Sequence, residues 1–153
     1  WKFKTDGDVT SSPAISDGVA YFGSYDNHLY ALDIKTGQEK WKFKTGGDIS
    51  SSPAISGGVA YFGSHDDHLY AVDIKTGQEK WKFKTDGDVH SSPAVSGGMA
   101  YFGSLDDNLY AVDIKTGQEM WKFKTNNRVA SSPAISGGIA YFGSGDGYLY
   151  AVK

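Results

Sequence analysis

The chain alternates polar and apolar residues with a period of two, which is typical of β-strands. The segments "VAYFGS" and "HLYALDI" are rich in aromatic and β-branched residues, and "KWKFKT" places lysines between aromatic residues. Short polar stretches that contain Gly, Asp or Asn separate these segments and indicate turns. No segment shows the period of a helix over an adequate length. The pattern therefore predicts an all-β fold of short antiparallel strands.

The same segments return every forty residues along the chain. Trp1, Trp41, Trp81 and Trp121 mark the period, and "SSPA", "AYFGS" and "LYA" recur on the same schedule. The repeats are residues 1–40, 41–80, 81–120 and 121–153, so the last repeat is seven residues short. Four strands in each unit of about forty residues are typical of a β-propeller blade. We therefore predict one propeller or half-propeller domain, 1–153, made of four-stranded antiparallel blades.

Composition narrows the classes of function. The net charge is −3, and the lysines recur between aromatic residues, which indicates a solvated strand face rather than a basic nucleic-acid-binding surface. The chain has no cysteine, so disulfides and thiolate metal sites are excluded. We expect no membrane span, because no apolar run approaches the required length. The first residue is Trp rather than Met, so we expect a processed, trimmed or engineered chain, and the sequence predicts no cellular compartment.

The turn after each third strand carries the pattern A-x-D-x-x-T-G-x-x-x-W. Its residues are Ala31, Asp33, Thr36, Gly37 and Trp41, then Ala71, Asp73, Thr76, Gly77 and Trp81, then Ala111, Asp113, Thr116, Gly117 and Trp121, with Trp1 as the fourth tryptophan. The pattern resembles the tryptophan-docking motif of the quinoprotein (PQQ-like) propeller repeat. The resemblance covers essentially the whole chain. It implies that "SSPAIS" is the innermost strand of a blade, that "WKFKT" is the outermost strand, and that the tryptophans tie neighbouring blades together.

The chemistry of these residues agrees with a structural role. Gly37 suits a turn that needs a positive φ, and Asp33 and Thr36 can form hydrogen bonds to the backbone around it. Trp41 buries a large apolar area and has one N–H that needs an acceptor. We therefore expect packing between blades rather than ligand stacking on the tryptophans. No such turn precedes Trp1, so we expect its docking to be the weakest of the four.

Positions that differ in chemical character between repeats fall mainly in two loops. One loop joins the second and third strands, and the other joins an outer strand to the next inner strand, so both emerge on one face. The candidate binding face contains Thr10, Tyr25, His28, Ser50, His65, His68, His90, Leu105, Asn108, Arg128, Gly145 and Tyr148. Loops on a rigid scaffold are common binding sites. We therefore expect an unidentified protein or small ligand, if one binds, to use this face.

The histidines and loop aspartates raise the question of a metal site. The histidines His28, His65, His68 and His90 fall in three different repeats, and "HDDH" matches no specific metal motif. We expect them to be solvated loop residues. Asp26, Asp66, Asp106 and Asp146 share one repeat position, where an aspartate more often fixes a loop than binds calcium. The sequence therefore predicts no metal and no cofactor.

Three classes of function follow from these observations. The leading hypothesis is a non-catalytic scaffold propeller, and the second is a binding module that uses the variable face. The third is a quinone-dependent dehydrogenase, for which the resemblance implies a catalytic Asp, calcium-binding Glu and Asn, and often a vicinal cysteine pair. The glutamates Glu39, Glu79 and Glu119 repeat in the opposite turn, so we expect no enzyme. Nearly identical repeats favour recent amplification of one blade or design from a consensus.

A propeller closes its ring because open sheet edges would pair with other chains. The segment Trp1–Thr5 is an outer strand, whereas the last repeat ends after its third strand. Trp1–Thr5 can therefore complete the last blade of its own chain, which gives a four-bladed monomer. It can also complete the last blade of a second copy, which gives an eight-bladed homodimer with two-fold symmetry. The family resemblance favours about eight blades, and we expect the homodimer, with the monomer as the alternative.

Overall fold

The computed structural model describes residues 1–153 and contains fifteen β-strands and no helix. The first blade comprises β1 (Ala14–Ser16), β2 (Val19–Gly23), β3 (His28–Asp33) and β4 (Glu39–Lys44). The second comprises β5 (Ala54–Ser56), β6 (Val59–Ser64), β7 (His68–Asp73) and β8 (Glu79–Lys84). The third comprises β9 (Ala94–Ser96), β10 (Met99–Gly103), β11 (Asn108–Asp113) and β12 (Glu119–Lys124). The last comprises β13 (Ala134–Ser136), β14 (Ile139–Gly143) and β15 (Leu149–Val152).

Each blade is a separate antiparallel sheet whose strands are ordered as they are in the chain. Blades one to three have four strands, and the last blade has three. The predicted all-β fold of antiparallel propeller blades is therefore confirmed. With no helix in the chain, there is also no helical segment that could cross a membrane.

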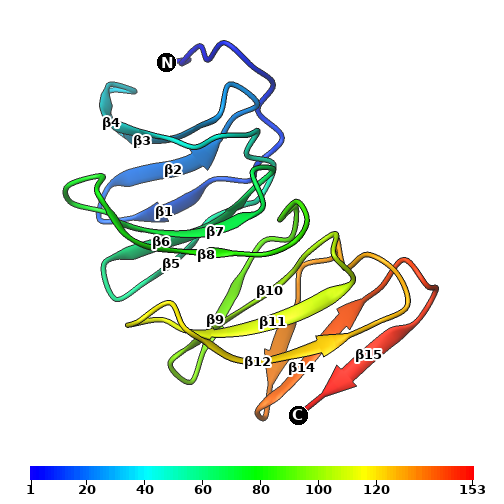
Figure 1. Cartoon of the computed structure of the whole chain (residues 1–153). Helices are drawn as coiled ribbons and strands as arrows, with labels where there is room; N and C mark the ends of the chain where they lie inside the picture. Colours follow the sequence, from blue (N-terminus) through cyan, green and yellow to red (C-terminus); the bar gives the residue numbers. More distant parts are fainter.

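The blades follow one another in an open arc, with the two chain termini at opposite ends (Figure 1). The short inner strands β1, β5, β9 and β13 are neighbours in this order. Serine side chains connect the segments that lead into them. The backbone N–H of Ser12 donates to Ser52 Oγ at 2.9 Å, and that of Ser52 donates to Ser92 Oγ at 2.8 Å. Small side chains at these positions let the inner strands approach closely.

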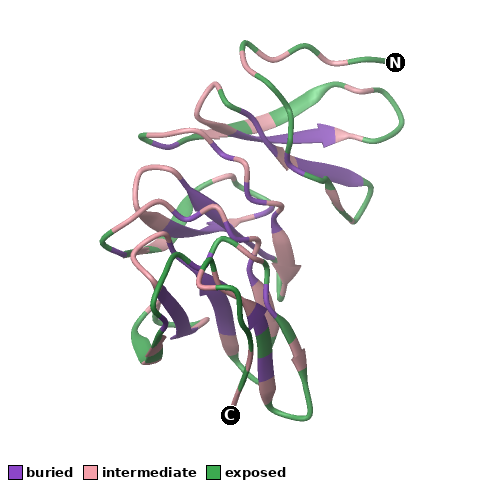
Figure 2. Cartoon of the chain, turned by 90° about the vertical axis from the view of Figure 1, so that its right-hand side faces the viewer, coloured by how far each residue is buried: buried purple, intermediate pink, exposed green.

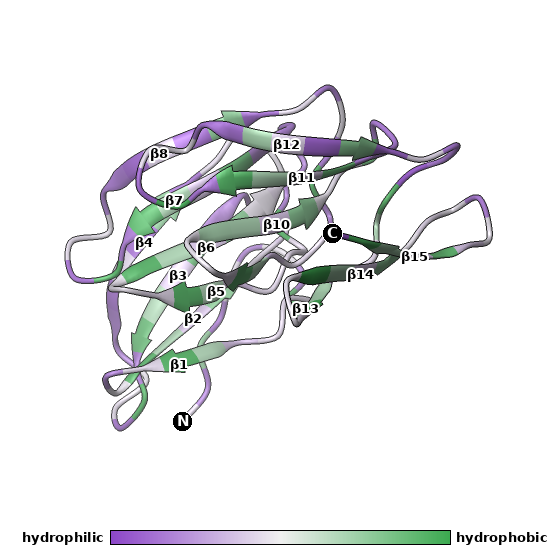
Figure 3. Ribbon diagram, turned by 90° about the horizontal axis from the view of Figure 1, so that it is seen from below, coloured by the Kyte–Doolittle hydropathy of each residue, from purple (hydrophilic) through white to green (hydrophobic).

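The second and third strands of each blade form its core. Every residue of β6 is buried, whereas the outer strands β4, β8 and β12 alternate between exposed and half-buried positions (Figure 2). The hydropathy follows the same division, with apolar middle strands and largely polar outer strands such as β8 and β12 (Figure 3). This distribution explains the lysines of "KWKFKT", which face solvent while Trp and Phe pack inward.

The hydrophobic core lies between blades as well as within them. One face of the first blade packs on the opposite face of the second. This shared cluster contains Val19, Tyr21, Leu29 and Ala31 from the first blade, and Ile49, Ala60, Phe62, Tyr70, Val72 and Ile74 from the second blade and the segment leading into it. Equivalent clusters join the second blade to the third and the third to the last. Each blade therefore needs a neighbour on both faces to bury its apolar side chains.

The ring is open in the single chain. Residues 1–13 form no strand, and no strand pairs with the free edge of β15. The sequence predicts a sixteenth strand at Trp1–Thr5, and the structure shows fifteen. A β-strand needs a neighbouring strand to pair with its backbone groups. Trp1–Thr5 has no such neighbour in this chain and therefore forms no strand.

Candidate functional site

The tryptophans of the outer strands β4 and β8, Trp41 and Trp81, dock on the turn of the following blade. The indole Nε1 of Trp41 donates a hydrogen bond to the Ile74 carbonyl oxygen at 3.0 Å, and Trp81 donates to Ile114 in the same way at 3.0 Å. The Trp41 ring lies against Gly77, where a Cβ atom would come within 2.7 Å of it. The carbonyl group that accepts the indole N–H therefore lies 33 residues after the tryptophan, in the next blade.

The receiving turn is held rigid by its own side chains. Asp73 Oδ1 accepts hydrogen bonds from the N–H groups of Lys75 and Thr76, both at 2.9 Å, and from the Thr76 hydroxyl at 3.2 Å. The hydrogen bond from the Thr76 N–H is the main cause of the lowered pKa of Asp73. Gly77 has a φ of 71°, a left-handed conformation that glycine adopts without strain. The aspartate, threonine and glycine of the motif therefore build a fixed platform for the indole.

The motif alanines lie under the tryptophans within the same blade. Ala31, Ala71 and Ala111 are fully buried, and each is opposite its tryptophan in the pairing of third and outer strands. A larger side chain at these positions would collide with the neighbouring blade, because protein interiors are close-packed. All three motif alanines therefore lie at junctions between blades.

Trp1 also docks on a turn, which corrects the expectation from the sequence. Its Nε1 donates to the Ile34 carbonyl oxygen at 3.0 Å, and its ring lies against Gly37. The expectation that Trp1 has the weakest docking of the four was wrong because it paired each tryptophan with the turn that precedes it. The indole that has no turn to dock on is that of Trp121, since the acceptor would come 33 residues later, beyond Lys153. Trp1 remains 68% exposed because no blade covers its other side.

The two variable loops lie together on one face. Backbone hydrogen bonds join them within each blade: Tyr25 N–H to Asp8 O, His65 N–H to Asp48 O, Leu105 N–H to Asp88 O and Gly145 N–H to Arg128 O, at 2.8–2.9 Å. Thr10, Ser50 and His90 come two residues after the aspartates of these pairs. The candidate residues from both loops are thus neighbours in space.

A second group of candidate residues is held within its own loops. His28 Nδ1 lies 2.8 Å from the Asp26 carbonyl oxygen, and His68 Nδ1 lies 2.7 Å from that of Asp66. The Asn108 side-chain amide donates to the Asp106 carbonyl oxygen at 3.0 Å. The equivalent residue in the last blade is Tyr148, whose side chain is exposed. His28, His68 and Asn108 are therefore held by the loops that carry them.

The loop aspartates accept hydrogen bonds from several protein groups, as Asp106 illustrates. Asp106 Oδ2 accepts the Tyr110 hydroxyl at 2.7 Å and the Asp86 N–H at 3.0 Å, while its Oδ1 accepts the Asn108 N–H at 3.1 Å. The tyrosine bond repeats in the other blades at 2.6–2.8 Å. Burial and then the Asp106 carboxylate raise the pKa of Tyr110, so the phenol stays protonated and keeps donating. These aspartates fix the loops to the third strand.

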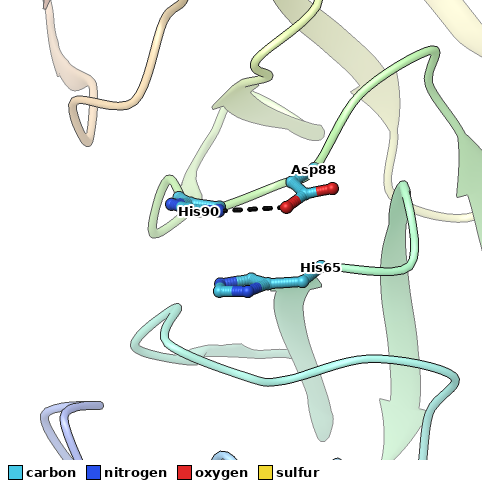
Figure 4. Close-up of side chains that lie close together, drawn as sticks. All are labelled: His65, Asp88 and His90. Carbon is cyan, nitrogen blue, oxygen red and sulfur yellow. Dashed lines mark hydrogen bonds and ion pairs between the residues drawn. The ribbon is translucent and has the colours of Figure 1, made fainter.

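The variable face brings two histidines from different blades into contact (Figure 4). The rings of His65 and His90 stack with centroids 3.9 Å apart and an interplanar angle of 13°. His90 Nε2 lies 3.3 Å from Asp88 Oδ2, and His65 Nε2 lies 2.8 Å from Ser50 Oγ. Tyr25 packs edge-on against His65 at 5.9 Å. Burial, and then the adjacent His90, lower the pKa of His65, which favours its neutral form.

The sequence analysis did not identify Asp88 or the grouping of His65 with His90. These residues lie in different repeats and belong to two different loops. The bond from Leu105 N–H to Asp88 O joins two loops of the third blade, so even this pairing, once known, does not point to His65. The loop between the second and third strands of one blade lies beside the connection that leads into the next blade. This contact is visible only in the three-dimensional packing.

Replacement of Gly77 by alanine is expected to destabilise the chain more than replacement of Gly58. Both glycines have a positive φ, of 71° and 77°, so both variants carry a similar backbone strain. A Cβ at Gly77 would also meet the Trp41 ring, whereas a Cβ at Gly58 meets nothing within 4 Å. We expect Gly77→Ala to lower the free energy of unfolding by about 1–3 kcal/mol more than Gly58→Ala in a denaturant titration. Equal losses would show that the indole does not rest on the turn.

The stability of the fold is expected to fall in acid through the loop aspartates. Burial raises the pKa of Asp106, but hydrogen bonds from Tyr110, Asn108 and Asp86 outweigh it and hold the pKa below its ordinary 3.8. A lowered folded-state pKa stabilises the fold above the unfolded-state value, and this stability disappears as the pH falls through the folded-state value. The free energy of unfolding should therefore decrease below about pH 4.

Asp106→Asn should reduce this acid-dependent loss, measured by denaturant titrations at a series of pH values. The control is Asp17→Asn in an exposed turn, where the side chain forms no hydrogen bond, and the acid-dependent loss should persist there. An acid profile of Asp106→Asn that parallels the parent chain at every pH would contradict the assignment.

Comparison with known proteins places this arrangement in a family. No curated protein matches the sequence. Three solved structures share the fold: computationally designed Ika8 (21% identity, TM-score 0.84), computationally designed Ika4 (20%, 0.87) and BamB from Moraxella catarrhalis (23%, 0.84). They match 94%, 97% and 97% of this chain, which in turn spans 45%, 92% and 48% of theirs. The chain is thus about half the length of two of them, and these similarities establish the propeller fold.

The sequence also matches a protein family over its entire length. The family is described as outer membrane protein assembly factor BamB, and two overlapping matches cover residues 1–79 and 41–153. The matched residues include every copy of the docking motif and both chain ends. The chain therefore belongs to this family of PQQ-like β-propeller repeat proteins.

Proposed function

We propose that the chain is a non-catalytic propeller scaffold that completes its ring with a second copy of itself. In this proposal, Trp1–Thr5 of one copy is the outer strand of the partner's last blade, and two copies form an eight-bladed ring. The proposal rests on the position of Trp1–Thr5 and on the two apolar faces at the ends of the arc.

The observation that supports the proposal is that Trp1 and Phe3 contact the first blade as Trp41 and Phe43 contact the second. Trp1 donates to Ile34 at 3.0 Å, as Trp41 does to Ile74. The Phe3 ring meets Tyr30 at 5.4 Å and 64°, and the Phe43 ring meets Tyr70 at 5.5 Å and 65°. The segment is thus docked on the first blade like the outer strand of a preceding blade, although the other three strands of that blade are missing.

The last blade has the reciprocal defect. It contains an inner, a second and a third strand but no outer strand. In the first blade, Ala31 is opposite Trp41 and Leu29 is opposite Phe43. The same register would place Ala151 opposite Trp1 and Leu149 opposite Phe3 of the partner. Each chain thus lacks what the other offers.

The exposed faces at the two ends match the halves of an internal junction. Leu149 is 79% exposed, whereas its equivalents Leu29, Leu69 and Leu109 are fully buried. At the other end, Val9 is 52% exposed and its equivalent Val89 is fully buried. An apolar hollow of about 320 Å³ lies beside Val9 and is lined by Phe22 and Leu32. Contact between these faces would reproduce a junction that the chain forms three times internally.

The proposed contact is head-to-tail, because it joins unlike ends of the chain. Such head-to-tail contacts close into a ring when the rotation allows it. The termini of one chain lie at opposite ends of the arc (Figure 1), and the chain spans about half of BamB and of Ika8. The alternative is a four-bladed ring in which one chain bends further, and the chain's span of 92% of Ika4 favours it.

A binding role on the variable face is the second candidate function. It is favoured by the chemical differences among equivalent loop residues, such as Tyr25, His65, Leu105 and Gly145, on an otherwise repetitive scaffold. A quinone-dependent dehydrogenase has less support, because Glu39, Glu79 and Glu119 follow the opposite turns and the chain has no cysteine.

Leu149→Ala tests the proposed closure, with Leu109→Ala as the matched variant. Leu109 is buried inside one chain, so its truncation should cost about 2–5 kcal/mol in any assembly state. Closure buries Leu149 equally, so we expect Leu149→Ala to cost a similar amount. The melting temperature of the parent chain should also rise with protein concentration, because association stabilises the fold by mass action.

The outcomes separate the alternatives. A negligible effect of Leu149→Ala would show that the face stays exposed and would refute closure of either kind. A large effect with a melting temperature independent of concentration would refute the dimer and support the four-bladed monomer. Deletion of Trp1–Thr5 should abolish the concentration dependence, because the strand that pairs with β15 is then absent.

A further inference from the structure

The junction between the second and third blades has a chemistry that the other junctions lack. His65, Asp88 and His90 each offer a ligand atom, and these atoms lie within 4.8 Å of one another. The equivalent positions hold Tyr25, Asp48 and Ser50 at the previous junction, and Leu105, Arg128 and Ala130 at the next. The cluster is therefore not a by-product of the repeat, since it appears at one junction of three.

The three side chains are polar groups at the loop end of the junction, where the His65 ring contacts the His90 ring across it. The hydrophobic clusters that join the second and third blades do not include them. His90 and Asp88 side chains are 35% and 39% exposed, so solvent reaches the cluster from the loop face. The group is thus anchored on rigid blades at one side and open at the other, which leaves room for water or a ligand atom.

The two imidazoles lie close together and nearly parallel. Their rings stack at 3.9 Å, and the Asp88 carboxylate lies 3.3 Å from His90 Nε2 at the same end of the cluster. Ser50 Oγ lies 2.8 Å from His65 Nε2, and hydrogen-bond partners of this kind fix the orientation of metal-binding imidazoles in proteins. To bind one ion, the two rings must tilt out of their stack so that both nitrogen lone pairs point at it, and the solvent-exposed side of the cluster leaves space for this movement.

We propose that His65, Asp88 and His90 bind a divalent transition-metal ion, with Zn²⁺ as the representative. Two imidazole nitrogens and one carboxylate oxygen are a donor set that suits Zn²⁺ and its neighbours in the transition series. Ca²⁺ and Mg²⁺ prefer oxygen donors and are disfavoured by two histidines. In the proposed site, water occupies the remaining coordination positions of the ion from the solvent-exposed side of the cluster. The proposal replaces the sequence-based expectation of no metal, and it does not depend on closure of the ring.

Calorimetric titration of the EDTA-treated 153-residue chain with ZnCl₂ tests the site. We expect one Zn²⁺ per chain. The variants His65→Leu and His90→Ala introduce the residues that the chain itself carries at Leu105 and Ala130, so the loops keep a compatible sequence. Each should weaken Zn²⁺ binding by about tenfold or more, because each removes a direct ligand.

The matched control is His68→Asn, which introduces the residue found at Asn108. His68 lies in the same loop as His65 but bonds to Asp66, outside the cluster, so Zn²⁺ binding should be unchanged. An equal loss in His68→Asn, undiminished binding in His65→Leu or His90→Ala, or no binding to the parent chain would each overturn the proposal.

The ligand count provides an independent test. With Cu²⁺ in place of Zn²⁺, electron paramagnetic resonance of the parent chain should show two nitrogen ligands, and His90→Ala should show one. A nitrogen signal unaffected by His90→Ala would contradict the assignment.

Discussion

The contact of a tryptophan with the turn of the following blade organises the whole chain. Trp41 reaches across a junction, gives its N–H to the Ile74 carbonyl and rests on Gly77. The turn is rigid because Asp73 and Thr76 satisfy its backbone groups. The indole therefore fixes both the distance between two blades and the direction in which the blades succeed one another. The hydrophobic clusters between blades can then form in one register.

The direction of this contact determines the state of the chain ends. Because each tryptophan looks forward, Trp1 is docked on the first blade and Trp121 lacks a turn. The same asymmetry leaves an apolar face at each end, marked by Val9 and Leu149. Two exposed faces that complement each other favour association, since burial of apolar area is the main force in assembly. In the proposed ring, closure would repeat the same contact that orders the blades.

Much of this arrangement was predictable from the sequence, and the remainder required the fold. The alternation in "KWKFKT" and the period of forty predict four-stranded blades, and Gly77 predicts a turn with positive φ. The pattern places Trp41 and Gly77 on the same schedule but does not say which turn receives which indole, hence the error at Trp1. The meeting of His65 with His90 depends on the packing of two loops from different blades, which no local pattern encodes.

The mass of the chain in solution, measured by light scattering behind size-exclusion chromatography, tests ring closure by two copies most directly. A single chain has a mass of 16.5 kDa. We predict twice this mass at micromolar concentration, because in the proposed ring the docked Trp1–Thr5 segment of one copy would pair with the free edge of β15 of the other. A mass of 16.5 kDa across the accessible concentration range would contradict the two-copy ring.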